Sequence, residues 1–187
     1  MMKNKGFTLV EMIVAVGLFA IVMVVATGAI FSIVGANRSA QSLNSAITNF
    51  SFAAESMVRD IRTGHGYVCG DKIVPISSVP TDCATNSTVD NSAIAFTNAD
   101  NIQVSYFLDS TTHQIMRLVN GASMPIAITA PEVVIQSMDF YVVGAADSSP
   151  KLQPKVLLII KGYAGTGKSQ SGFDIQTLIS QRLLNTQ

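Results

Sequence analysis

A long apolar segment near the N-terminus limits what this chain can fold into. Residues 7–36 read FTLVEMIVAVGLFAIVMVVATGAIFSIVGA, and Glu11 is the only charged residue among them. As a helix that rises about 1.5 Å per residue, this run is long enough to cross the roughly 30 Å hydrocarbon core of a bilayer. Lys3 and Lys5 precede it, so the positive-inside rule predicts a cytoplasmic N-terminus and a chain that continues on the other side of the membrane.

Two simpler interpretations of this segment fit less well. A secretory signal peptide has a shorter apolar core, followed by a small-residue cleavage site. A plain membrane anchor explains the length but not Glu11, because an ionisable side chain in a membrane span is costly and usually has a partner.

Composition excludes two further classes of protein. The 187 residues carry 12 basic and 12 acidic side chains, and 13% are charged against roughly 25% in a typical soluble domain. A disordered chain would be poorer in apolar residues and higher in net charge. A nucleic-acid partner is not predicted, because the chain has neither a basic balance nor a run of basic residues.

The segment KGFTLVE at residues 5–11 resembles the class III signal of type IV pilins and pseudopilins, which are small filament subunits cleaved by a membrane-embedded prepilin peptidase. The resemblance implies cleavage after Gly6, methylation of the new amine on Phe7 and a role for Glu11 in assembly. It also implies a long N-terminal helix with a small β-rich head.

The chemistry of this signal can be followed from the residues. Gly6 presents a backbone without a side chain to the peptidase, and cleavage leaves a cationic amine on Phe7. Glu11 follows four residues later on the same helix face, where the helix dipole favours a carboxylate. We expect Glu11 to pair with the Phe7 amine of a neighbouring subunit and so to set the axial register. The alternative is a solitary carboxylate at headgroup depth.

The helix is predicted to continue to Thr63, because residues 37–63 are amphipathic and Gly64 and Gly66 follow. The apolar positions of this half are Leu43, Ile47, Phe50, Ala54, Met57 or Val58, and Ile61. We therefore expect a leader at 1–6, a transmembrane and assembly helix at 7–36, an amphipathic helix at 37–63 and a globular head at 64–187.

The head has the sequence pattern of β-structure. Strands are predicted at 92–97, 101–108, 114–119, 132–143, 155–161 and 173–184, with proline and glycine between several of them. The expected fold class is α+β, with the long helix packed on an antiparallel sheet. The order of these strands resembles the heads of larger minor pilins and pseudopilins of the PilW/PulJ kind.

Cys69 and Cys83 are the chain's two cysteines, and their spacing fits neither a CxxC redox motif nor a four-ligand zinc site. In an oxidising compartment we expect a disulfide between them, which would stabilise the fold by roughly 3 kcal/mol in the chain-entropy model. A pair of reduced buried thiols, or a metal site that includes His65, are the alternatives.

A competing motif lies near the C-terminus. Residues 162–169, GYAGTGKS, fit the phosphate-binding P-loop pattern GxxxxGK[ST], with Lys168 and Ser169 in the positions that contact phosphate and magnesium. Only 18 residues follow Ser169, too few for the rest of a nucleotide-binding fold. Residues from Phe173 onward alternate as a strand, so we interpret the motif as a hairpin loop.

The sequence thus predicts a minor pilin or pseudopilin of a type IV pilus, competence or type II secretion system, and not an enzyme. No cofactor or metal is expected, since His65 and His113 lack partner patterns and the acidic residues lack calcium-ligand spacing. The resemblance implies as partners the prepilin peptidase, other subunits, an inner-membrane assembly platform and, before assembly, membrane lipid. The implied location is the inner membrane with the head outside the cytoplasm, then the filament. The alternative is a single-pass membrane-anchored binding or sensor protein that does not polymerise.

Overall fold

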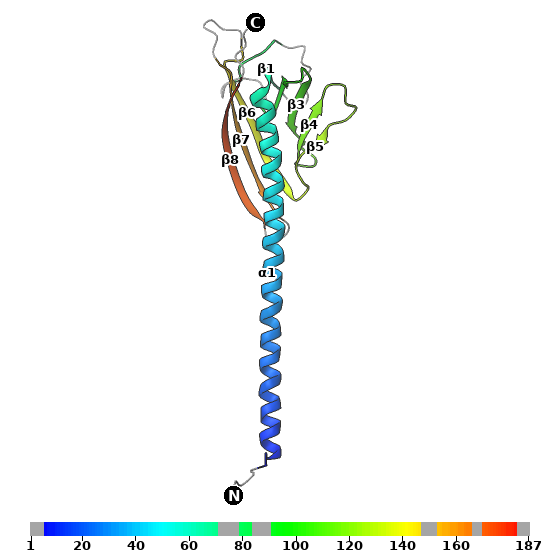
Figure 1. Ribbon diagram of the computed structural model, residues 1–187, viewed down its shortest axis with the longest axis vertical. Coiled ribbons are helices and arrows are strands. Elements are labelled where there is room, and N and C mark those ends of the chain that lie inside the picture. Colours follow the sequence, from blue (N-terminus) through cyan, green and yellow to red (C-terminus); the bar gives the residue numbers. More distant parts are fainter. Residues whose placement is uncertain (1–5, 71–78, 84–90, 147–152, 166–169, 183–187) are drawn as a thin grey trace. The chain divides into compact units, whose positions relative to one another are not determined.

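A computed structural model of the chain describes residues 6–70, 79–83, 91–146, 153–165 and 170–182. It divides the chain into two compact units, Met1–Gln41 and Ser42–Gln187. One helix, α1 (Leu9–Thr63), passes from the first unit into the second (Figure 1). The predicted helix at 7–63 is therefore confirmed apart from its first two residues, and the 55 residues of α1 contain no proline to interrupt the hydrogen-bond ladder.

The C-terminal end of α1 is closed by a buried tyrosine. The Gly64 amide donates to the Ile61 carbonyl at 3.1 Å. The Tyr67 hydroxyl lies 2.6 Å from the Ile61 carbonyl oxygen and 2.7 Å from that of Gly64. These contacts satisfy carbonyl groups that the end of a helix leaves without a partner. Burial raises the pKa of Tyr67, because ionisation would place a charge away from water.

Within the described residues, the strands form two antiparallel sheets (Figure 1). Sheet A has the order β1-β2-β3-β4-β5, and its strands are β1 (His65–Gly70), β2 (Ala93–Thr97), β3 (Gln103–Leu108), β4 (Ile115–Val119) and β5 (Ile126–Ala127). Sheet B has the order β6-β7-β8, and its strands are β6 (Val133–Val143), β7 (Lys155–Ala164) and β8 (Ser171–Ser180). The α+β class and the antiparallel head are confirmed.

The sequence analysis missed two strands, β1 and β5. In β1, Gly66 adopts a φ of 68° and the pairing with β2 shifts register between His65 and Val68. A short strand with glycine at a bulge carries little local signal, so its pairing with β2 is what makes it a strand. The two-residue β5 is likewise a strand only because it pairs with β4.

The last two strands begin and end differently from the prediction. β7 continues to Ala164 and β8 begins at Ser171, because Ala164 and Ser171 pair across the hairpin. β8 ends at Ser180, short of the predicted residue 184. The Arg182 amide donates to the carbonyl of Arg62 on α1 at 2.8 Å, and the last two residues of the predicted strand, 183 and 184, lie outside the described residues.

The second unit has a core to which α1 contributes one face. The buried residues of this face are Ala46, Phe50, Ala53, Met57 and Ile61. The Phe50 and Phe173 rings lie 4.5 Å apart between centroids, so the helix packs directly on β8. The expectation for Ile47 was wrong: its side chain is exposed, and the smaller Ala46 and Ala53 lie on the buried face.

The two sheets are joined along the outer edge of β6. The amide of Ile135 donates to His113, that of Phe140 to Asn91, and that of Val142 to Cys83, at 2.9, 2.8 and 3.1 Å. Cys83 also donates its own amide to Val142 at 2.8 Å. Segments that lead into or out of sheet A thus cover this edge of sheet B.

A polar cluster fastens sheet A to the helix. The Tyr106 hydroxyl donates to Asp60 Oδ2 at 2.7 Å, and Arg117 Nη2 donates to the same oxygen at 3.2 Å. Arg117 Nε also donates to the Tyr106 hydroxyl at 3.0 Å. Burial, and then the hydrogen bond to Asp60, raise the pKa of Tyr106 because both oppose formation of a phenolate.

This cluster predicts alkaline sensitivity of the head. An unfolded tyrosine ionises near its ordinary pKa of about 10, whereas Tyr106 in the fold holds its proton to higher pH. The stability is therefore complete below about pH 10 and falls above it, by up to about 1.4 kcal/mol per pH unit for each such tyrosine. Urea unfolding of the full chain in detergent at pH 8 to 11 measures this slope. Tyr106→Phe should reduce the slope and leave the contribution of Tyr67, and an unchanged slope would contradict the assignment.

Gly162 marks a close approach of two strands. A Cβ at this position would contact the Val134 carbonyl oxygen on β6 and lie 3.1 Å from the Phe173 ring on β8. The backbone oxygen has little freedom to move, because β6 is paired on both sides.

We expect Gly162→Ala to lower the free energy of unfolding by about 1–3 kcal/mol, as overpacked substitutions do. Gly172→Ala on the adjacent strand is the matched control, because its Cβ would find its nearest neighbour at an ordinary 3.8 Å. Thermal unfolding of both variants makes the comparison. Equal stability of the two would show that the approach of β6 and β7 is looser than described.

Candidate functional site

The predicted assembly residues lie at the start of α1. Gly6 and Phe7 precede the helix, and the Phe7 side chain is 77% exposed. Glu11 lies in the first turn, where the positive end of the helix dipole favours a carboxylate. The structure thus places the three residues together at one helix end, and their roles in cleavage, methylation and assembly stay predictions.

Thr8 begins the helix, a feature the sequence analysis did not identify. Its Oγ1 accepts a hydrogen bond from the Glu11 amide at 3.3 Å, and its carbonyl accepts one from the Met12 amide at 3.2 Å. The spacing Thr-x-x-Glu is that of a capping box, so the signal was present in the sequence. Glu11 is therefore both the candidate assembly residue and the third residue of a capped helix.

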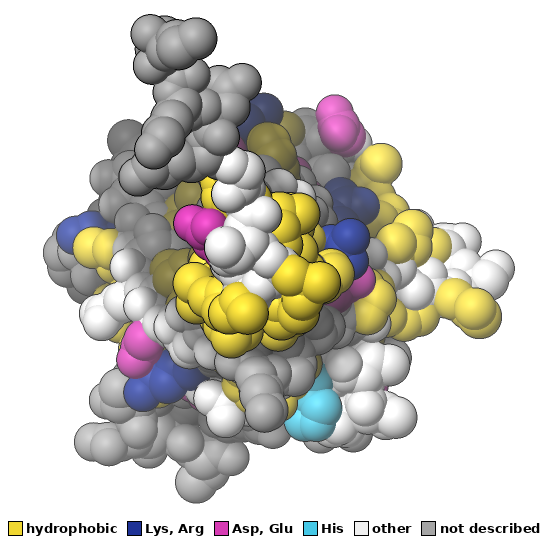
Figure 2. All heavy atoms as spheres, turned by 90° about the horizontal axis from the view of Figure 1, so that it is seen from below, with side chains coloured by type: hydrophobic (Ala, Val, Ile, Leu, Met, Phe, Trp, Pro, Cys, Tyr) yellow, Lys and Arg dark blue, Asp and Glu magenta, His cyan; other side chains and the backbone are white. Residues whose placement is uncertain are grey.

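The apolar segment exposes its side chains all round. Every residue from Gly6 to Arg38 is exposed in the structure, including large side chains such as Phe19 and Phe31. Seen from below, hydrophobic side chains surround the N-terminal part of the helix (Figure 2). By length and composition α1 contains a segment able to cross a membrane, and none of that segment is buried against the described residues. Water alone is a poor environment for such a surface, which indicates lipid or other helices around it.

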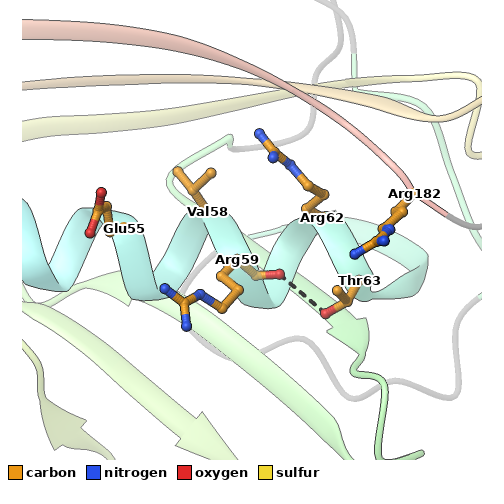
Figure 3. A pocket seen from close by; sticks show the side chains of 6 residues that line it. All are labelled: Glu55, Val58, Arg59, Arg62, Thr63 and Arg182. Atoms are coloured by element: carbon orange, nitrogen blue, oxygen red, sulfur yellow. Dashed lines mark hydrogen bonds between the residues drawn. The ribbon is translucent and has the colours of Figure 1, made fainter.

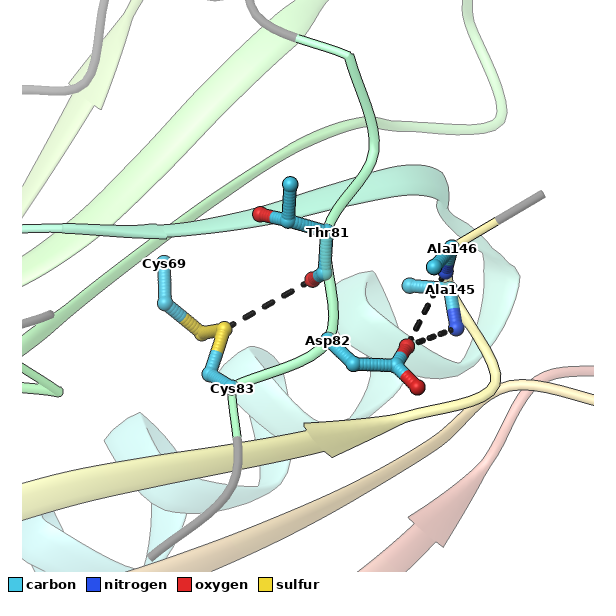
Figure 4. The surroundings of a disulfide bond; sticks show 6 residues. All are labelled: Cys69, Thr81, Asp82, Cys83, Ala145 and Ala146. Carbon is cyan, nitrogen blue, oxygen red and sulfur yellow. Dashed lines mark hydrogen bonds between the residues drawn. A yellow bond between two sulfur atoms is a disulfide. The ribbon is translucent and has the colours of Figure 1, made fainter. Parts of the chain in front are cut away.

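The predicted disulfide between Cys69 and Cys83 is present (Figure 4). It joins β1 to the segment that pairs with β6, and both cysteines are buried. Next to it, Asp82 Oδ1 accepts the amides of Ala145 and Ala146 at 2.6 and 3.0 Å. The disulfide and this carboxylate together hold the segment at 79–83 against both sheets. Their role is therefore to stabilise the fold.

The described part of the P-loop-like motif, residues 162–165, lies on one arm of a β-hairpin. Its first residues end β7, Gly165 turns with a φ of 103°, and β8 follows in antiparallel pairing. A nucleotide-binding loop is instead followed by a helix whose N-terminus faces the phosphates. Lys168 and Ser169 lie outside the described residues.

The two histidines considered in the sequence analysis do not belong to a metal-binding group in the described part of the chain. His65 begins β1, and His113 lies in the turn before β4 with a φ of 55°. Among the described residues, no group of three His, Cys, Asp or Glu side chains is placed to hold a metal ion.

A basic hollow lies at the C-terminal end of α1 (Figure 3). Its volume is about 430 Å³, and its lining is Glu55, Val58, Arg59, Arg62, Thr63 and Arg182. Figure 3 shows the arginine side chains pointing in different directions rather than toward one centre. Basic side chains are favoured at the negative end of a helix dipole, which accounts for the composition of this hollow.

Comparison with known proteins gives one match, and it covers the same segment. Residues 1–27 match the family model described as the prokaryotic N-terminal methylation motif. No curated protein and no solved structure matches the chain significantly. The motif implies processing by a peptidase and assembly with other pilin subunits. Together with the long apolar helix and the antiparallel head, it supports a membrane-anchored protein of the type IV pilin-like or pseudopilin class.

Proposed function

We propose that this chain is a structural subunit, a minor pilin or pseudopilin of the PilW/PulJ kind, which enters a filament of a type IV pilus, competence or type II secretion system. The observation that carries the proposal is the methylation motif at the start of a helix whose first part, to residue 36, is exposed throughout and apolar apart from Glu11 and a few small polar residues. A helix of this kind is stable in lipid before assembly and packed among the helices of other subunits afterwards.

The proposed sequence of events begins at the membrane. Residues 7–36 span the inner membrane, Lys3 and Lys5 stay on the cytoplasmic side, and the head at 64–187 lies outside the cytoplasm. The prepilin peptidase hydrolyses the peptide bond after Gly6, and the new amine of Phe7 receives a methyl group. An inner-membrane assembly platform then moves the subunit out of the lipid.

The proposed role of Glu11 is to select and align the neighbouring subunit. Glu11 lies in the first turn of α1, and Phe7 precedes it by four residues, so the carboxylate and the amine that cleavage exposes are both at the N-terminal end of the helix. In apolar surroundings each charge is stabilised by an opposite charge from the adjacent subunit. The pair forms only at one axial offset between the two helices, which defines the register of the filament.

Processing can be tested by intact mass. We expect the mature protein from its native host to lack residues 1–6 and to carry one methyl group on the Phe7 amine. Gly6→Leu should retain the leader, because its side chain obstructs the peptidase. Gly17→Leu, inside the helix, is the control and should be processed normally. A mature chain that keeps Met1 would contradict the prepilin interpretation.

Assembly can be tested by Glu11→Ala. We expect the variant to insert in the membrane and form its disulfide, yet to enter filaments at least about tenfold less. Without the carboxylate, the neighbour's Phe7 amine stays unpaired in apolar surroundings, at a cost of about 3 kcal/mol. Immunoblots of sheared filament and membrane fractions measure the distribution.

Glu55→Ala is the matched control, since Glu55 is a carboxylate on the same helix outside the apolar segment. We expect it to assemble like the wild type. Normal filament entry by Glu11→Ala would instead favour the second candidate, a membrane-anchored binding or sensor protein that does not polymerise. The fully exposed apolar helix is compatible with that candidate, whereas the methylation motif favours the filament.

A further inference from the structure

The two outer edges of sheet B differ. Three amides of β6 that point away from β7, those of Ile135, Phe140 and Val142, donate to the carbonyls of His113, Asn91 and Cys83, as described above. On the opposite side, β8 is the last strand of the sheet. Among the described residues, no strand pairs with its outer edge.

The direction of the backbone groups in β8 follows from one hydrogen bond. The Gln181 amide donates to the Pro154 carbonyl on the β7 side at 3.0 Å, which continues the register Lys155↔Ser180 by one step. Backbone groups of successive residues in a strand point to opposite sides. Since β7 and β8 pair without a register shift, the even-numbered residues direct their N–H and C=O groups outward. They are Gly172, Asp174, Gln176, Leu178 and Ser180.

The next even-numbered residue agrees with this assignment. The Arg182 amide points outward and donates to the Arg62 carbonyl on α1 at 2.8 Å. Figure 3 shows Arg62 and Arg182 beside Thr63 at the end of the helix. The helix thus closes the edge at Arg182, and no other described segment pairs with the edge from Gly172 to Ser180, which we call the open edge.

The open edge lacks most of the devices that prevent strand addition. Proteins blunt exposed edges with proline, lysine, bulges or very short strands. β8 is ten residues long, contains neither proline nor lysine, and pairs with β7 without a bulge. Its one charged residue, Asp174, lies 3.5 Å from Lys161 on β7.

One apolar side chain, that of Leu178, faces the solvent on this strand. The Leu178 side chain is 62% exposed. In the register of the sheet, Leu178 pairs with Leu157, and Leu157 pairs with Tyr141. This row of apolar side chains ends at the open edge, and a further apolar side chain opposite Leu178 would extend it.

We propose that β8 receives an extended segment of another polypeptide, which pairs with residues from Gly172 to Ser180 as a fourth strand of sheet B. The segment has an apolar residue opposite Leu178 and an uncharged or basic residue opposite Asp174, and its bonding positions are free of proline. Main-chain hydrogen bonds supply the affinity and these side chains the specificity. That the partner is a neighbouring subunit rests on the proposed function; the strand addition itself does not.

The test places a photo-reactive amino acid in the full-length chain in its native host. At Gln176, on the open edge, we expect irradiation to give an adduct with another polypeptide. At Gln136, an exposed residue of β6 whose edge is closed, we expect little or none. Absence of an adduct at Gln176 in both membrane and filament fractions would overturn the proposal.

A second substitution shows whether the backbone carries the contact. Leu178→Pro removes an outward N–H without breaking a bond to β7, so the Cys69–Cys83 disulfide should still form. We expect it to reduce the adduct at Gln176 by about tenfold, whereas Leu178→Thr, which keeps the N–H, reduces it far less. If Leu178→Pro fails to form the disulfide, Leu178→Lys replaces it, because a lysine on an edge opposes strand addition without touching the ladder.

The outcomes separate this proposal from the proposed function. A chain that reaches filaments but gives no adduct at Gln176 refutes only the strand addition. A chain that never reaches filaments but gives a proline-sensitive adduct in the membrane refutes only the filament role. An adduct that is equally strong in Leu178→Pro and Leu178→Thr refutes pairing through the backbone.

Discussion

The burial of one face of α1 is the interaction on which the described head depends. Between Ala46 and Ile61 the helix turns a narrow apolar face inward, and side chains of both sheets join the same core. Neither sheet has another helix within the described residues to cover it. The Phe50–Phe173 contact ties sheet B to this face, and the hydrogen bonds of Asp60 with Tyr106 and Arg117 tie sheet A to it. The same element therefore serves two environments, with all-round apolar exposure in its first half and a single buried face in its second.

The candidate site and the head impose different requirements on this helix. At its start, Thr8 caps the helix and Glu11 occupies the first turn, so local chemistry alone positions the candidate assembly residue. At its end, the buried Tyr67 hydroxyl and the amide of Arg182 reach the carbonyls of Ile61 and Arg62. The end of the helix is thus held by Tyr67, which follows it closely in sequence, and by Arg182 from a distant part of the chain. Within the part of the chain that the structure describes, the β6 edge of sheet B is bonded to other segments and the β8 edge is open.

Much of the fold was predictable because its signals are local. The apolar run, the three- and four-residue spacing after it and the alternation in β3 and β6 depend on neighbours in sequence. β1 was missed because glycine at a bulge gives no alternation, and only β2 makes it a strand. Ile47 was misplaced because either of two adjacent helix faces satisfied the spacing. Ala46 and Ala53 are the residues that are buried, and which face is buried depends on how closely the sheets approach the helix. Thr8 could have been found, since its capping spacing to Glu11 is visible in the chain.

By itself the sequence determined the helix, its division into an apolar and an amphipathic half, the leader motif and the β-rich character of the head. These properties depend on runs and periodic patterns of residues that are close in sequence, so they can be inferred from the sequence directly. Only the tertiary structure decided that the strands divide into two sheets and that β6 is covered by segments around sheet A. It also decided that β8 stops at Ser180, where Arg182 turns to the helix. Those outcomes depend on hydrogen bonds between backbone groups of distant segments, and patterns a few residues long do not specify which distant segments pair.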